Sequence, residues 1–153
     1  MDSGLLCAKK LFFSRCRLDR GLLEQIVDGV IDYDFLEKLD LSFNALGGDG
    51  LVTLKLSAMC RRVRCLEALL LRDCGLTLSF LQDLLVDDGY DWRRTLTQLD
   101  LAGNVMTHYA ASAIGTILQS TVCIELMGDL LNYAMVKDVA GSLELSLKFE
   151  CFF

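Results

Sequence analysis

The side chains best suited to chemistry are the cysteines, because thiolates bind metals and act as nucleophiles. Cys60 and Cys65 are separated by four residues and flank three arginines. A zinc site needs four ligands, yet no second cysteine pair follows and His108 is the only histidine. The arginines could lower a thiol pKa, although we expect such reactivity to be minor here. The spacing therefore predicts no metal site.

Catalysis has little support in the sequence. Neither a glycine-rich phosphate loop nor G-x-S-x-G is present, and a single histidine without a nucleophile beside it makes a triad an unfavourable interpretation. The acidic run of Asp87, Asp88 and Asp91 lacks the D-x-D-x-D-G spacing of a calcium loop and is interpreted as a solvated loop. We therefore expect no enzyme, with no catalytic, cofactor-binding or metal-binding residues.

Composition sets further bounds. A length of 153 residues suits one domain, and 53% hydrophobic residues are too many for a disordered chain. A net charge of −6 argues against a general nucleic-acid binder. Seven cysteines are an odd number, and no secretory signal precedes them. We expect reduced, mostly buried thiols in a cytoplasmic protein, with the nucleus or cilium left open.

One stretch has the length of a membrane span. Residues 101–124 contain no Asp, Glu, Lys or Arg. Polar residues and two glycines interrupt this stretch, however, and a repeat explains the same residues better. We therefore predict no membrane insertion.

The elements that would position any site follow an internal repeat. Segments from Leu36, Leu66 and Leu96 each fit L-x-x-L-x-L-x-x-(N or C)-x-L, followed by apolar residues five and eight positions later. In the copy from Leu36 those two residues are Leu51 and Leu54. These three starts are evenly spaced, and projection adds a copy near position 8 and a degenerate one near 124. The column of turn residues reads Cys16, Asn44, Cys74 and Asn104.

This pattern resembles the leucine-rich repeat family over nearly the whole chain. The repeats are long for this family, with starts near positions 8, 36, 66 and 96, and are similar to its ribonuclease-inhibitor-like subtype. The resemblance implies an α/β solenoid of about five repeats in a single domain, residues 1–153, with a parallel concave sheet and convex helices. Each L-x-L element forms a strand, the Asn or Cys side chain bonds to unpaired backbone groups of the turn, and the later apolar residues face the core from an amphipathic helix.

Two local features belong to this interpretation. Gly47, Gly48 and Gly50 are expected to loosen the second turn. Ser79 with Gln82 is interpreted as a capping box that opens the third helix.

The concave face is the expected contact surface, because the resemblance implies that partners dock there. Phe12 and Leu70 place large apolar groups on an otherwise polar face, as interface anchors do. The alternative is that the outward positions are merely solvated. The predicted partner-binding residues are Lys10, Phe12, Lys38, Asp40, Leu70, Arg72 and Asp100.

A second candidate surface follows from the even spacing of the repeats. Asp34 would neutralise Arg64 and leave Trp92 and Arg94 for an acidic or aromatic partner. Basic charge at helix ends, stabilised by the helix dipole, is the favoured interpretation of the same columns. The two columns are Asp34, Arg64 and Arg94, and Asp32, Arg62 and Trp92.

Both ends depart from the pattern. The first strand, roughly Lys9 to Ser14, would be an open sheet edge. Asp129 falls where an inward leucine belongs, so a register shift is expected there. Residues 143–153 alternate apolar and polar side chains as an atypical C-terminal strand, or they form an unrelated terminus. We expect a partner or self-association to cover both ends.

The sequence therefore predicts a non-catalytic protein–protein interaction or scaffold module, a subunit of a larger assembly with one or more protein partners. The alternative is a regulatory leucine-rich repeat protein of the GTPase-activating or signalling type. This chain resembles such regulatory proteins only in the repeat scaffold, and a fold alone does not transfer function.

Overall fold

The described residues form a parallel sheet of five short strands. The computed structural model describes residues 8–31, 33, 35–86, 95–104, 113, 116 and 125–127. The strands stand side by side in chain order and are paired in parallel throughout. They are β1 (Lys10–Phe12), β2 (Lys38–Asp40), β3 (Ala68–Leu70), β4 (Gln98–Asp100) and β5 (Glu125–Met127).

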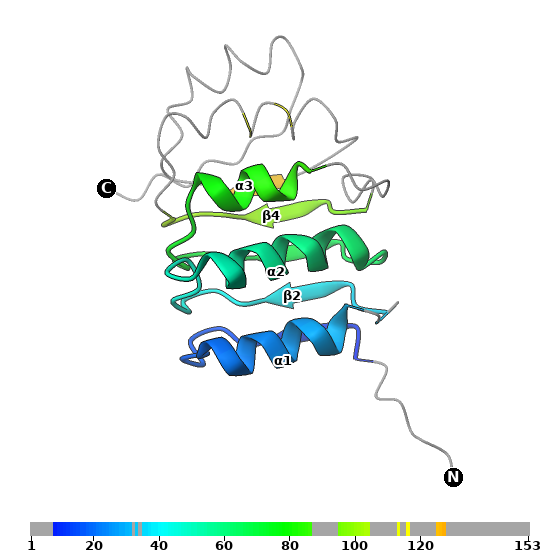
Figure 1. The fold of residues 1–153 in the computed structure, drawn as a ribbon. Coiled ribbons are helices and arrows are strands. Elements are labelled where there is room, and N and C mark those ends of the chain that lie inside the picture. The colour runs from blue at the N-terminus through cyan, green and yellow to red at the C-terminus, as the bar shows by residue number, and fades with distance from the viewer. Residues whose placement is uncertain are drawn as a thin grey trace.

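Helices connect the strands and stack on one side of the sheet (Figure 1). They are α1 (Arg20–Val30), α2 (Gly50–Arg62) and α3 (Leu78–Leu84). Each helix contacts the next along the stack, so every repeat packs mainly on its neighbours. The expected α/β solenoid of parallel strands and outer helices is confirmed. No helix in the described part of the chain has the length and apolar character needed to cross a bilayer.

The sheet register follows the leucine pattern. Leu39, Leu69 and Leu99 pair in one row and are completely buried. Leu11 precedes them in the same row, and Leu126 follows Leu99. The fifth repeat is thus displaced by one position from its expected start near 124, which would have placed Met127 beside Leu99. Asp129 had indicated such a shift, because a carboxylate at an inward position is costly to bury.

Aspartates open the first two helices. The Asp19 carboxylate accepts a 2.8 Å hydrogen bond from the Leu22 N–H, and Asp49 accepts one of 2.9 Å from Leu51. The third helix differs from the prediction. Thr77 is its N-cap residue and makes no side-chain cap bond, while Ser79 already lies inside the helix. The predicted Ser79–Gln82 capping box is wrong, because the helix begins at Leu78.

The second helix presents a different face from the expected one. Leu23 and Leu81 are buried and follow the turn residue of their repeats by seven positions, whereas the buried Val52 follows Asn44 by eight. The turn before α2 is two residues longer than the turns before α1 and α3, and the inward face of α2 is shifted by one position relative to its turn residue. Leu51 and Leu54, predicted to face the core, are consequently 54% and 47% exposed.

The Asn or Cys of each repeat ties its turn to the preceding repeat. The Asn104 amide donates to the Leu71 carbonyl at 2.7 Å and accepts from the N–H groups of Cys74 and Leu76 at 3.0 and 2.9 Å. Asn44 bonds the first repeat in the same way, donating to the Phe13 carbonyl at 2.9 Å. The expected role of this column is confirmed for these residues, and it satisfies buried backbone groups.

The structure explains the residue types at two turn positions, which the repeat spacing did not predict. The residue before each Asn or Cys has a positive φ in all four turns: Arg15 58°, Phe43 60°, Asp73 49° and Gly103 71°. Gly47 was expected to loosen its turn, but it permits a close approach instead. A Cβ on Gly47 would lie 1.7 Å from the Gly75 carbonyl oxygen. The N–H of Gly47 also donates to the Cys74 carbonyl at 2.9 Å.

Candidate protein-binding face

The outward strand residues form two columns across the sheet. In β1 to β4, period-two alternation turns one residue at each end of the strand away from the helices. The first column pairs Lys10, Lys38, Ala68 and Gln98, and the second pairs Phe12, Asp40, Leu70 and Asp100. All the predicted concave residues except Arg72 thus lie in these two columns, and Arg72 follows shortly after the end of β3. This surface is the candidate protein-binding face.

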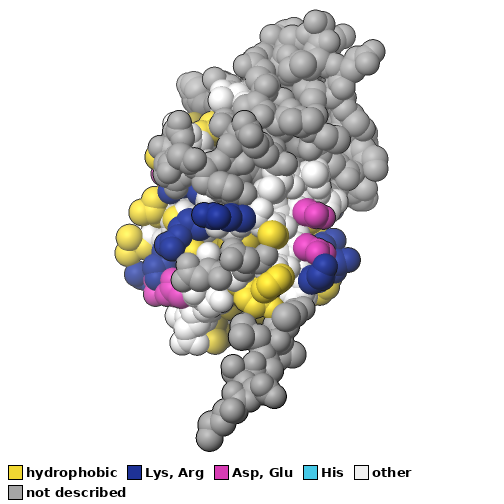
Figure 2. All heavy atoms as spheres, turned by 90° about the vertical axis from the view of Figure 1, so that its right-hand side faces the viewer, with side chains coloured by type: hydrophobic (Ala, Val, Ile, Leu, Met, Phe, Trp, Pro, Cys, Tyr) yellow, Lys and Arg dark blue, Asp and Glu magenta, His cyan; other side chains and the backbone are white. Residues whose placement is uncertain are grey.

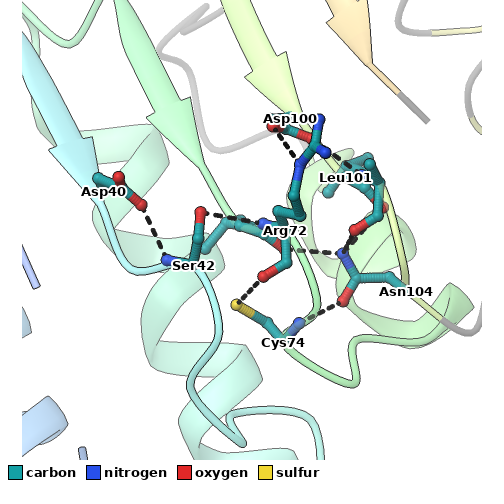
Figure 3. Close-up of polar contacts among 9 residues, drawn as sticks. Asp40, Ser42, Arg72, Cys74, Asp100, Leu101 and Asn104 are labelled. Carbon is teal, nitrogen blue, oxygen red and sulfur yellow. Dashed lines mark hydrogen bonds and ion pairs between the residues drawn. The ribbon is translucent and has the colours of Figure 1, made fainter. Parts of the chain in front are cut away.

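In the half of this face over β3 and β4, the charged side chains bond to other residues of the chain. Asp100 is only 6% exposed, and its carboxylate accepts from the Ala102 N–H at 3.0 Å. Its second oxygen lies 3.2 Å from the Nε atom of Arg72 (Figure 3). Arg72 and Asp100 therefore belong to the face by position, but much of their hydrogen-bonding capacity is already committed.

Asp40 plays the same turn role on β2. Its carboxylate accepts from the Ser42 N–H at 2.9 Å, and the Ser42 hydroxyl accepts from the Arg72 N–H at 3.3 Å (Figure 3). An aspartate at the end of the strand caps its own turn, as an Asx turn does. Leu70 stands between Asp40 and Asp100 in register and has no such bond to make. It is partly exposed and leaves an apolar position between two acids.

The half over β1 and β2 is aromatic and basic. Phe12 is 60% exposed, and the Lys38 ammonium lies 5.8 Å from the centroid of its ring. Beyond the ends of the same two strands, the Arg15 guanidinium lies 4.1 Å from the centroid of the Phe43 ring. Cations at these distances are attracted to the negative ring faces. Figure 2 shows Lys and Arg side chains in separate groups, each near hydrophobic and acidic side chains.

Arg15 and Phe43 were not among the residues predicted from the sequence. Both follow the strand at the left-handed turn position, which the period-two alternation does not cover. The available signal was their equivalent placement in successive repeats, each just before the Asn or Cys.

The described thiols divide into two kinds. Cys60 and Cys74 are buried, whereas Cys16 and Cys65 are exposed, so the prediction of mostly buried thiols holds for half of them. Burial raises the pKa of Cys60 to about 12, although Arg61 acts in the opposite direction. Burial also raises the pKa of Cys74 to about 11. Cys16 is exposed because it follows the first strand of the described sheet, where no earlier described strand receives its side chain.

No site of another kind emerges from the described residues. A hollow between the starts of α1 and α2 has a volume of about 50 Å³, with Leu18, Leu23 and Val52 in its wall. Ligand pockets usually measure about 300–1,000 Å³, so this hollow has room only for water. Within the described ranges, no three His, Cys, Asp or Glu side chains are grouped as metal ligands.

Several predicted features lie outside the described residues. They include the alternative edge with Trp92 and Arg94, the first members of its two columns, Asp32 and Asp34, the acidic run 87–91, His108, and the terminal segments 1–7 and 143–153.

A family comparison agrees with the geometry. The family model described as leucine rich repeat matches residues 35–55 and 94–115, which include β2 and β4. These two matches support a place in the leucine-rich repeat family. Domains of this family generally mediate protein–protein interactions and are generally not enzymes. Together, fold and comparison define a leucine-rich repeat solenoid of a kind that commonly binds proteins.

Proposed function

We propose that this chain is a protein-interaction or scaffold module that holds a partner protein on the concave sheet, as a subunit of a larger assembly. The observation that carries the proposal is Phe12, a large ring that is 60% exposed on a sheet face. Leu70 offers a second apolar contact in the same column. Large apolar groups surrounded by polar ones are typical of interface anchors.

The proposed contact residues are those of the original prediction, with unequal roles. Lys10, Phe12, Lys38 and Leu70 would make the contacts. Asp40, Arg72 and Asp100 would hold the shape of the face through their turn and cross-strand bonds.

The finer classification is also a proposal. We propose the ribonuclease-inhibitor-like subtype in a single domain, supported by the long connections between strands that start at positions 10, 38, 68 and 98. Free thiols at all four described cysteines support a reducing, cytoplasmic setting.

The test uses a photo-crosslinkable phenylalanine analogue in place of Phe12 in the full chain, expressed in cells. Leu54 is the matched control position, because it is also apolar and about half exposed but lies on α2. We expect position 12 to crosslink to a protein partner and position 54 not to. Partners captured only from position 54 would overturn the proposal.

A variant at Leu70 checks that the crosslink reports the whole face. Leu70→Lys removes the apolar group and places a cation beside Asp40, the acid with which position 70 is paired in register on β2. We expect this variant to reduce the crosslink from position 12. An undiminished crosslink would show that Leu70 is outside the interface.

A further inference from the structure

We propose that the half of the face over β1 and β2 binds an acidic peptide segment that carries a hydrophobic residue. This inference rests on the proposed function and names the partner chemistry of the same face. It concerns a cluster that we call the basic–aromatic strip: Lys10, Phe12, Arg15, Lys38 and Phe43.

The strip concentrates positive charge in an acidic chain. Between Lys9 and Arg20 there are five basic residues and one acid, although the whole chain has a net charge of −6. Lys9 and Arg20 are neutralised by ion pairs, at 2.6 Å to Glu37 and 2.8 Å to Asp49. Within the described residues, Lys10, Arg15 and Lys38 have no carboxylate within ion-pair distance. Their charge is therefore available to a ligand.

The two lysines stand side by side. Lys10 and Lys38 are paired in register on neighbouring strands, which are about 4.8 Å apart. Like charges directly opposite each other in a sheet are destabilising, and an anion that reaches both ammonium groups would relieve this repulsion. The same column continues with Ala68 and Gln98, so among β1 to β4 this doubled positive charge is confined to the first two strands.

The aromatic rings indicate which residue should stand next to the acidic residue of the peptide. Phe12 lies two residues beyond Lys10, or about 7 Å along the strand, which is also the spacing of alternate side chains in an extended peptide. An acidic residue at the lysine pair would therefore place a hydrophobic residue on Phe12. Farther along, Arg15 presents its guanidinium from the Phe43 ring, where it can bind a second carboxylate.

A peptide fits this strip better than a nucleic acid. Asp40 is paired in register with Phe12, inside the strip, and Glu37 lies against Lys9. Phosphates repeat at every nucleotide of a nucleic-acid strand, so some of them would be repelled by these carboxylates. A peptide can carry acidic residues only at the positions that face the cations.

The test measures fluorescence anisotropy of the full chain with three labelled peptides. The first has the sequence E-E-L-E-F-E-E, the second replaces every E by Q, and the third replaces every E by K. We expect binding of the first peptide alone, weaker at raised salt because the contacts are exposed. Equal binding of the first two would overturn the inference.

Variants locate the site. Lys10→Gln and Lys38→Gln should each weaken binding about two- to fivefold, as is usual for exposed ion pairs. Phe12→Ser should weaken it about fivefold or more. Lys55→Gln is the matched control, because it removes the same charge from α2. If the Lys55 variant weakens binding as much as the others, the inference fails.

Two further ligands separate the alternatives, a short oligothymidylate and vesicles that contain phosphatidylserine. If either binds more tightly than the acidic peptide, the inference is overturned. The proposed function is judged independently by the photo-crosslink. A protein captured at position 12 together with no binding of the acidic peptide would leave that function standing and remove this inference.

Discussion

The guanidinium of Arg15 lies 4.1 Å from the centroid of the Phe43 ring, and the two residues occupy the same left-handed turn position in successive repeats. The same column continues with Asp73 and Gly103, where the Asp73 carboxylate fills the place that a Cβ on Gly103 would take. Side chains at this position thus reach toward the next repeat. The last described member of the column is a glycine because its neighbour occupies the space.

Gly103→Ala should therefore destabilise the fold for two reasons. A φ of 71° costs a residue with a Cβ about 1–2 kcal/mol, and the new Cβ would lie 2.0 Å from an Asp73 carboxylate oxygen. Urea denaturation should show a lower free energy of unfolding. In an Asp73→Ala background the same substitution should cost less, because only the backbone strain remains. Equal costs in both backgrounds would contradict the contact with Asp73.

Asn104→Leu tests the buried bonds between repeats. The substitution would leave the N–H groups of Cys74 and Leu76 and the Leu71 carbonyl without their side-chain partner. At about 1–3 kcal/mol for each unsatisfied group, we expect the free energy of unfolding to fall by at least about 3 kcal/mol. Cys16→Ala is the control at the equivalent position, where the thiol is exposed, and it should change stability by under about 0.5 kcal/mol. Similar losses for both would refute the proposed role of the column.

Gly47→Ala tests the close approach of two turns. Its Cβ would overlap the Gly75 carbonyl, which is backbone and cannot move aside cheaply. We expect a loss of about 3 kcal/mol, at the upper end of the usual cost of overpacking. Gly48→Ala is the matched control, since no atom lies within 4 Å of its added Cβ. Thermal or urea unfolding of the two variants gives the comparison, and a tolerated Gly47→Ala would show that the turns are not in contact.

The buried thiols predict a dependence of stability on alkaline pH. Burial raises the pKa of Cys60 to about 12 and that of Cys74 to about 11, from an ordinary value of 9.0. Between the unfolded and the folded pKa values, the folded state binds more protons than the unfolded state. The free energy of unfolding therefore falls as pH rises from about 9 toward 11 and 12. The contribution is fully present below pH 9. Unfolding curves across this range measure it.

Alkylation with site mapping by mass spectrometry provides the independent check on these thiols. At mildly alkaline pH, Cys16 and Cys65 should react in the native protein, because both are exposed. Cys60 and Cys74 should react only on unfolding. Native alkylation of Cys60 at the rate of Cys65 would contradict its burial.

The sequence was sufficient for the architecture because the repeat places leucine at fixed intervals. Leu39, Leu69 and Leu99 could be assigned to one buried row from spacing alone, and the outward columns followed from the alternation of a strand. The Asn and Cys positions were also predictable, since their side chains satisfy backbone groups that every turn exposes.

Only the tertiary structure decided how neighbouring repeats fit together. A longer turn shifts the inward face of α2 and exposes Leu51 and Leu54, and an offset of one position places Leu126 beside Leu99. Within the candidate face, Arg72 and Asp100 join across strands, while Arg15 rests on Phe43. These contacts depend on helix phase and side-chain direction between repeats. A linear pattern specifies which residues face outward, but it does not specify which of them are already engaged by a neighbour.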